Sequence, residues 1–380
     1  MEPGGVHVDC RHFTNVPILD YGQTTRPDTR QEFLAQLRDA LVNVGFMYLK
    51  NPPVPITVQE KLVEKAKEMF DLPLEKKEQL AMVNSKHFLG YTRLGDERTT
   101  GKTDHRESFD FSTECLPPGP EEPLYRNLRG PNQWPNESDV PGGRDAIETY
   151  LNAIGHLADD FKILIAEALD MPSASFLGFF DNLAQNKLKL VKYPPPEPSI
   201  CESSESTRQG VGIHKDASFL TFLLQGTSHL GLEVQNKGGT WIPVPPIPGT
   251  LVINIGRSLE ALTGGVCTAT THRVNLRPEN FLDSITKQPL GPRYSFPVFQ
   301  GLALDLTRDQ MNLDIPPHIR ELVKDIQVKS DAEKYLNHIF RGCIGEGSFM
   351  ARLAAHPDVG RRWYPAMLER VLEDQRRITN

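Results

Sequence analysis

The first part of the chain alternates between short apolar runs and longer stretches whose apolar residues recur at helical spacing. We expect strands at residues 16–19 and 46–49, where apolar residues follow one another directly. One helix is predicted from Asp28, which resembles a side-chain N-cap, to Gly45, and another from Thr57, which opens a capping-box pattern. The predicted buried faces consist of Phe33, Leu37, Leu41 and Val44 in the first helix and Leu62, Ala66, Met69 and Phe70 in the second.

The middle of the chain changes from one long helical pattern to a series of short β-rich runs. Residues 147–165 keep a helical period over about five turns. From about residue 187 to 304, short runs of β-branched and aromatic residues stand between turn residues, which favours a sandwich or a jelly roll. The predicted strands are 189–193, 219–224, 231–235, 250–255, 271–276 and 294–298, and the tail from residue 330 is predicted to be helical.

These changes of pattern divide the chain into four regions and indicate an α+β protein. We expect a mixed α/β N-terminal region at 1–115 and a Pro- and Gly-rich connection with the long helix at 116–186. The β core would occupy 187–305, and a helical extension would follow at 306–380. Helices from both ends of the chain would therefore flank one β core.

Composition and charge exclude several classes of protein. The 42 Lys and Arg against 49 Asp and Glu give a net charge of −7, which disfavours a nucleic-acid-binding protein. The five cysteines are scattered without a C-x-x-C pair, which argues against a disulfide framework or a zinc ribbon. No stretch approaches the ~20 apolar residues of a membrane span, and the N-terminus lacks a signal-peptide core. We expect a cytoplasmic monomer that binds neither nucleic acid nor membrane.

The first candidate chemistry is the triplet His214-Lys215-Asp216. In a strand, the first and third side chains share a face, so an imidazole and a carboxylate would point to the same side. In non-haem iron(II) oxygenases, two histidines and one carboxylate bind the metal and leave its other coordination positions open. A lone triplet of this kind is usually incidental, so a second histidine is required. His272 is the best candidate, because the 272 − 216 = 56 positions between them let several strands go out and return.

A second candidate site follows in Arg293-Tyr294-Ser295, which begins 293 − 272 = 21 positions after His272. Arg293 and Ser295 would share one strand face. A guanidinium fork beside a hydroxyl suits a carboxylate, because two parallel charge-assisted bonds fix its plane. An Arg-x-Ser triplet is common in proteins. It supports a carboxylate site here only because it follows the two histidine motifs.

Taken in order, these motifs resemble the isopenicillin N synthase-like family of Fe(II)/2-oxoglutarate-dependent dioxygenases over roughly residues 14–305. The segments VPILDYG and ALVNVGFMYLKNPPVP resemble its N-terminal region, and GYTRLGDERTTGKTDHRESFDF resembles its Gly-Tyr and acidic-aromatic landmarks. The segment GIHKDASFLTFLLQG is similar to its metal strand, and LGLEVQNKGGTWIPVPPIPGTLVINIGRSLEALTGG to the hairpin and turn that follow. THRV and PRYSFPVF complete the pattern.

The resemblance implies a double-stranded β-helix, a jelly-roll barrel with a metal in its mouth. It implies that Fe(II), 2-oxoglutarate and O2 oxidise a small organic molecule by hydroxylation, desaturation or ring rearrangement, in secondary-metabolite biosynthesis. No catalytic residue beyond the metal centre is expected. The implied iron ligands are His214, Asp216 and His272. The implied ligands of the distal 2-oxoglutarate carboxylate are Arg293, Ser295 and Tyr193, although Tyr193 reads equally well as an ordinary strand tyrosine.

Substrate contacts are the least defined part of the sequence. Phe219, Phe296 and Phe299 lie near the ligand strands and are candidate substrate residues, although the barrel core is the favoured interpretation for all three. Contacts could also come from residues 88–93 and from the C-terminal helices.

One departure from the family pattern keeps alternatives open. Val191 stands where many plant members have an asparagine that can contact the metal-bound end of the co-substrate, and valine cannot replace it. An iron-dependent oxidase of the same fold that does not use 2-oxoglutarate, or an ethylene-forming enzyme, therefore stays an alternative. A jelly-roll binding protein without catalysis is a further alternative, which the complete set of metal ligands disfavours.

Overall fold

The computed structural model describes residues 13–99, 102–181, 186–196, 209–283, 285–324 and 342–379. Cys10, Cys201 and the start of the predicted C-terminal helical region, at 330–341, lie outside these residues. Among the described helices, none is long and apolar enough to cross a membrane.

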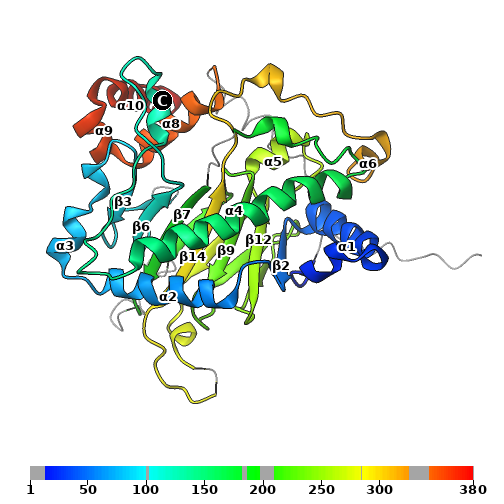
Figure 1. Cartoon of the computed structure of the whole chain (residues 1–380), viewed down its shortest axis with the longest axis horizontal. Coiled ribbons are helices and arrows are strands. Elements are labelled where there is room, and N and C mark those ends of the chain that lie inside the picture. The colour runs from blue at the N-terminus through cyan, green and yellow to red at the C-terminus, as the bar shows by residue number, and fades with distance from the viewer. Residues whose placement is uncertain are drawn as a thin grey trace, which may run out of the picture.

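An eight-stranded sheet, which we call the major sheet, runs through the whole molecule (Figure 1). All its neighbouring strands are antiparallel except β1 and β2, which run parallel. In spatial order the strands are β1 (Ile18–Asp20), β2 (Phe46–Lys50), β12 (Thr250–Ile255), β9 (Leu220–Gln225), β14 (Arg293–Gln300), β7 (Asn186–Tyr193), β6 (Glu107–Ser112) and β3 (Gly90–Thr92).

A four-stranded minor sheet faces the major sheet and closes the barrel. Its antiparallel strands are β11 (Trp241–Pro243), β10 (Leu232–Gln235), β13 (His272–Asn275) and β8 (Gln209–His214). The inter-sheet core contains Val191, Leu223 and Val252 of the major sheet and Val234 and Val274 of the minor sheet. The predicted jelly-roll core of an α+β fold is therefore confirmed. The short β4 (Arg98–Thr99) and β5 (Lys102–Thr103) form a separate ribbon.

Helices cover the outer face of the major sheet. In Figure 1, α2 (Ile56–Phe70) and α4 (Gly143–Ala168) cross this face, and α1 (Pro27–Asp39) lies beside β2. The main hydrophobic core lies between these helices and the sheet and includes Phe161 of α4, whose ring packs edge-on against Phe222 of β9 at 5.8 Å between centroids. Three shorter helices are α3 (Leu74–Gln79), α5 (Arg257–Leu262) and α6 (Pro317–Glu321).

The C-terminal helices gather beside β3 and β6, at one end of the major sheet (Figure 1). They are α8 (Ile344–Ala355), α9 (Pro357–Trp363) and α10 (Pro365–Thr379). A third hydrophobic cluster joins Phe349, Leu353 and Val359 of these helices to Phe88 and Met82. The tertiary contact of α8 with the barrel matters for the site, because it brings Arg352 to within 3.6 Å of Asp110 on β6.

The predicted helices and strands are confirmed, with corrections at their ends. Gly45 ends the first helical segment in the left-handed conformation, as expected, after a π-helical turn at Ala40–Val44. The two predicted helix caps are wrong: α1 begins at Pro27, with no side-chain cap, and α2 begins at Ile56, one residue before Thr57. Proline is favoured at the first helical position, so α1 begins one residue before Asp28. The short strand predicted at 16–19 lies at Ile18–Asp20.

Tyr150 on α4 carries a buried hydroxyl without a hydrogen-bond partner among the described residues. Because burial of an unsatisfied hydroxyl costs free energy, we expect Tyr150→Phe to raise the free energy of unfolding by about 1 kcal/mol. Urea denaturation measures this change. Tyr91→Phe is the matched control, since the Tyr91 hydroxyl donates to Glu107 at 2.7 Å and its loss should destabilise. A loss of stability in Tyr150→Phe would contradict the prediction.

Candidate metal centre and co-substrate site

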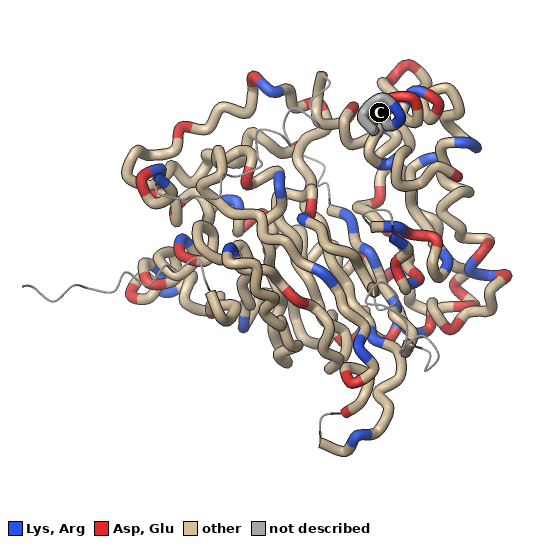
Figure 2. Tube along the Cα trace, turned by 180° about the vertical axis from the view of Figure 1, so that it is seen from behind, with Lys and Arg blue, Asp and Glu red and all other residues tan. Residues whose placement is uncertain are grey.

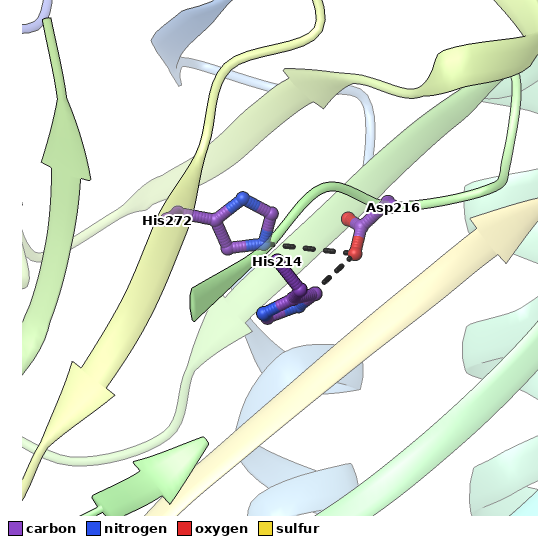
Figure 3. Close-up of side chains that lie close together, drawn as sticks. All are labelled: His214, Asp216 and His272. Carbon is purple, nitrogen blue, oxygen red and sulfur yellow. Dashed lines mark ion pairs between the residues drawn. The ribbon is translucent and has the colours of Figure 1, made fainter. Parts of the chain in front are cut away.

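His214, Asp216 and His272 come together where β8 ends and β13 begins (Figure 3). Each offers one ligand atom, and the three atoms lie within 4.8 Å of one another. Asp216 Oδ1 is 3.4 Å from His214 Nε2 and 3.6 Å from His272 Nε2. The two histidines are direct partners across β8 and β13, which places their rings 4.2 Å apart between centroids. The structure therefore brings together the three residues that the sequence singled out.

The local geometry of the triplet differs from the expected strand face. Strand β8 ends at His214, and Asp216 lies in the turn that follows. The turn is fixed by a backbone hydrogen bond from the Arg257 amide to the Asp216 carbonyl at 2.8 Å. The two side chains therefore converge because the chain bends toward β13, and not because of the two-residue period of a strand. Lys215 points elsewhere, to an ion pair with Glu260 at 3.4 Å.

Both imidazoles are oriented by backbone carbonyls. His214 Nδ1 donates to the Gly212 carbonyl at 2.8 Å, and His272 Nδ1 donates to the Thr270 carbonyl at 3.0 Å. With a proton on Nδ1, each Nε2 keeps a free lone pair aimed toward Asp216 Oδ1. Such carbonyl contacts fix the tautomer and ring orientation of metal-binding histidines. Phe46 packs edge-on against His272 at 5.1 Å between centroids and restricts that ring further.

Asp216 is held by two polar side chains that the sequence gave no reason to select. Thr221 Oγ1 donates to Asp216 Oδ2 at 2.6 Å, and Asn254 Nδ2 donates to the same oxygen at 2.9 Å. These bonds occupy Oδ2 and leave Oδ1 facing the two histidines. Thr221 and Asn254 are direct partners across β9 and β12, so adjacent strands of the major sheet position them together.

The charges of the three residues are mutually dependent. Burial disfavours the Asp216 carboxylate, but the two imidazoles outweigh it and hold the pKa of Asp216 well below its usual range. Burial likewise disfavours the imidazolium of His272, and the Asp216 carboxylate outweighs this effect and raises the pKa of His272. The group thus attracts positive charge, which is the property required of a cation site. Two imidazole nitrogens and one carboxylate oxygen fit the donor set of non-haem Fe(II).

Arg293 is a buried cation in the space between the sheets. Its side chain is 1% exposed, and Nη1 has no hydrogen-bond partner among the described residues. Burial lowers the pKa of Arg293, and the guanidinium lies 4.8 Å from the centroid of the Tyr193 ring, directly across β14 and β7. A buried guanidinium with a free donor is costly unless an anion reaches it. The site therefore fits the distal carboxylate of 2-oxoglutarate.

Ser295 and Val191 share the interior face with this guanidinium. Ser295 lies two residues after Arg293 and pairs with Val191 across the strands, and both side chains are buried. Val191 packs in the inter-sheet core, so the position that departs from the family pattern is apolar packing here. The predicted set Arg293, Ser295 and Tyr193 is thus assembled on two neighbouring strands.

The three phenylalanines named as candidate substrate contacts do not share a location. Phe219 is fully buried in the main core, between Phe176 and Phe180. Phe296 is also fully buried in that core, on the helix-covered face of β14. Both side chains therefore pack in the core, which was the favoured interpretation of these residues. Phe299 is partly exposed and pairs with Thr221, so it alone lies on the interior face.

Comparison with known proteins agrees with this geometry. Residues 16–137 match the family model described as the N-terminal part of the non-haem dioxygenases in morphine synthesis, and residues 181–301 match the 2OG-Fe(II) oxygenase superfamily. A 2-oxoglutarate-dependent dioxygenase of Gibberella zeae is 46% identical over 96% of this chain and 95% of its own length. A second one, from Dothideomycetidae sp., is 42% identical over 94% of both chains.

A solved structure confirms the fold. The chain resembles full-length Neurospora crassa T7H in complex with alpha-KG and thymine, with a TM-score of 0.66 and 23% sequence identity over 80% of this chain and 89% of that one. The matched sequences and the shared jelly-roll core lead to one assignment. The chain belongs to the isopenicillin N synthase-like family of Fe(II)- and 2-oxoglutarate-dependent dioxygenases.

Proposed function

We propose that His214, Asp216 and His272 hold Fe(II), and that Arg293 with Ser295 and Tyr193 holds the distal carboxylate of 2-oxoglutarate. The single observation that supports this best is the convergence of three metal-ligating atoms within 4.8 Å, in a chain of this family. The Arg293 guanidinium supports the second assignment independently, because it is buried and its Nη1 has no hydrogen-bond partner among the described residues.

The residues of the chain act by orientation and by exclusion of water. Bound Fe(II), with 2-oxoglutarate and O2, supplies the oxidising power. His214 and His272 present fixed Nε2 lone pairs, and Asp216 presents one oxygen while Thr221 and Asn254 retain the other. Arg293 fixes the far end of the co-substrate, so its reactive end has a defined position. The apolar inter-sheet core around Val191 keeps bulk water from this region.

The substrate and its setting belong to the same proposal. We infer that the substrate is a small organic molecule of secondary metabolism and that the enzyme acts in the cytoplasm as a monomer. T7H, a structural neighbour, was crystallised with thymine, which supports a small molecule as the kind of substrate. Hydroxylation, desaturation and ring rearrangement are the reaction types that this centre supports.

The deciding experiment is an anaerobic titration of the metal-free protein with Fe(II) and then 2-oxoglutarate. We expect a visible charge-transfer band when both are bound. Fe(II) binding without a band on addition of 2-oxoglutarate would favour an iron oxidase in which Arg293 and Ser295 anchor another anion. Absence of Fe(II) binding would overturn the assignment of the three ligands.

Thr221→Val provides a quantitative test of the support for Asp216. The substitution keeps the shape of the side chain and removes the hydroxyl that donates to Oδ2. Loss of such an outer contact costs about 10–100-fold in metal affinity, and we expect a Kd for Fe(II) raised by that factor. Competition with a metal-binding dye under anaerobic conditions measures it. Thr221→Ser, which retains the hydroxyl, is the matched control, and equal affinity in both variants would contradict the role.

A further inference from the structure

A group of charged side chains lies on the interior face of β6 and β7. Side chains alternate along a strand, so Lys187 and Lys189 share the face of Val191 and Tyr193, which pack in the inter-sheet core. Asp110 of β6 lies directly across from Lys189. Figure 2, viewed from the side opposite α4, shows Lys and Arg positions on neighbouring strands of the major sheet. Charge therefore faces the same interior as the candidate iron ligands.

The position of Lys187 relative to the candidate metal centre follows from strand register. Lys187 pairs with Phe299 of β14, and Phe299 pairs with Thr221 of β9. The Thr221 hydroxyl in turn donates to Asp216. Two strand spacings, about 10 Å, separate the backbones of Lys187 and Thr221. Lys187 therefore lies on the same interior face as Thr221, two strands away, and its ammonium is close enough to Arg352 and Asp110 to be affected by their charges.

The carboxylates of this group already have cationic partners. Asp110 lies 3.0 Å from Lys189 Nζ and 3.6 Å from Arg352 Nη2. Two further carboxylates, Glu97 and Asp104, lie outside these strands and pair with Arg106, whose Nε is 2.9 Å from Glu97 and whose Nη2 is 3.1 Å from Asp104. Lys189 also contacts Glu97. Each of these three buried acids therefore already has a cationic partner, and none is left to bind a cationic ligand.

Lys187 differs from Lys189 because its ammonium has no such partner among the described residues. No hydrogen bond or ion pair to its ammonium occurs among the described residues, although the side chain is only partly exposed. Desolvation, reinforced by the nearby positive charge of Arg352, lowers the pKa of Lys187 to about 7. Arg352 itself has a buried Nε without a hydrogen-bond partner in the described part of the chain. His356 adds no compensating charge, because burial, with the positive charge of Arg352, holds its pKa well below the usual value.

We propose that Lys187, assisted by Arg352, binds a carboxylate of the primary substrate. The inference rests on the proposed function, since it assumes that oxidation takes place at the candidate iron centre. An incoming carboxylate would supply the partner that the ammonium lacks and would lower the cost of its burial. The bound acid would lie on the interior face that also carries Thr221, the partner of Asp216, two strands away.

The site for this carboxylate is separate from the co-substrate site. Arg293 pairs with Tyr193, which lies six residues along β7 from Lys187. Six residues of strand span about 20 Å, farther than the two carboxylates of one 2-oxoglutarate molecule can reach. The two interior cations therefore serve two different molecules.

The test uses benzoate and benzamide, which have similar shapes and differ in charge. Enzyme loaded anaerobically with Fe(II) and saturating 2-oxoglutarate is first checked for its charge-transfer band, then titrated by calorimetry with each compound. We expect benzoate to bind about tenfold more tightly than benzamide, since one charge-assisted contact is worth roughly that factor. The preference should vanish in Lys187→Met and persist in Lys187→Arg.

Lys192→Met is the matched control, because Lys192 lies on the opposite face of the same strand and pairs with Glu107 at 3.2 Å. Its preference for benzoate should equal that of the wild type. Equal binding of benzoate and benzamide, no benzoate binding at millimolar concentrations, or an unchanged preference in Lys187→Met would each overturn the inference. Benzamidine is titrated in the same way, and tighter binding of benzamidine than of benzoate would overturn the inference in favour of a cationic substrate. Absence of the charge-transfer band in the wild type would instead count against the proposed function.

Discussion

Replacing His272 with alanine is expected to abolish turnover, because it removes one of three ligands on which Fe(II) binding is proposed to depend. His272 is buried and its Nε2 faces Asp216, so no neighbouring described residue can take its position. Both succinate formation from 2-oxoglutarate and the anaerobic charge-transfer band should fall below detection. The loss should be larger than that in Thr221→Val, which removes only an outer contact.

The fold of His272→Ala should survive. Asp216 keeps the hydrogen bonds from Thr221 and Asn254, so its carboxylate is not left without partners. Circular dichroism and the urea midpoint check this. His318→Ala is a suitable control, since His318 is exposed and pairs with Asp170, which is not one of the candidate ligands. Retained turnover in a folded His272→Ala protein would remove His272 from the proposed iron site.

The candidate metal ligands could be predicted because their chemistry is restrictive. Few residue types bind a divalent metal, and His214 and Asp216 stand close enough in the sequence to be recognised as a pair. The three candidates do come together in the structure, although Asp216 does so from a position after the strand and not from the shared strand face that was expected. The ordered series of motifs, rather than any one spacing, identified His272 as the third member.

The supporting residues could not be predicted, because only tertiary pairing gives them their roles. Thr221 and Asn254 are ordinary strand positions until β9 and β12 pair beside Asp216. Lys187 and Lys189 alternate with leucines, a pattern that usually places lysine in solvent. Here α4 and the inter-sheet core cover both faces of the strand, so the lysines are enclosed.

The ends of helices were the least predictable part of the fold. Asp28 and Thr57 both carry side chains that commonly cap helices, and neither does so. In α1 the proline at the first position sets the backbone angle that starts the helix. Several side-chain oxygens near a helix start can satisfy the same orphan donors, so local sequence leaves the first residue undefined by one or two positions.

Replacing Arg293 with methionine is expected to raise the KM for 2-oxoglutarate by about ten- to hundredfold, because a charge-assisted contact to a carboxylate is worth ~1.5–3 kcal/mol. Methionine retains much of the apolar stem and removes the guanidinium. Fe(II) binding should be unchanged, since the three candidate ligands lie on other segments. Titration of the charge-transfer band with 2-oxoglutarate measures the affinity directly and separates it from turnover.

The stability of the same variant gives an independent result. In the protein without co-substrate, the Arg293 guanidinium is buried with an unused donor, an arrangement that costs free energy. Arg293→Met should therefore unfold at the same or a higher urea concentration than the wild type when 2-oxoglutarate is absent. Addition of 2-oxoglutarate should stabilise the wild type and leave the variant nearly unchanged, because a ligand stabilises a protein only as far as it binds. If 2-oxoglutarate stabilises both proteins equally, Arg293 does not bind its carboxylate.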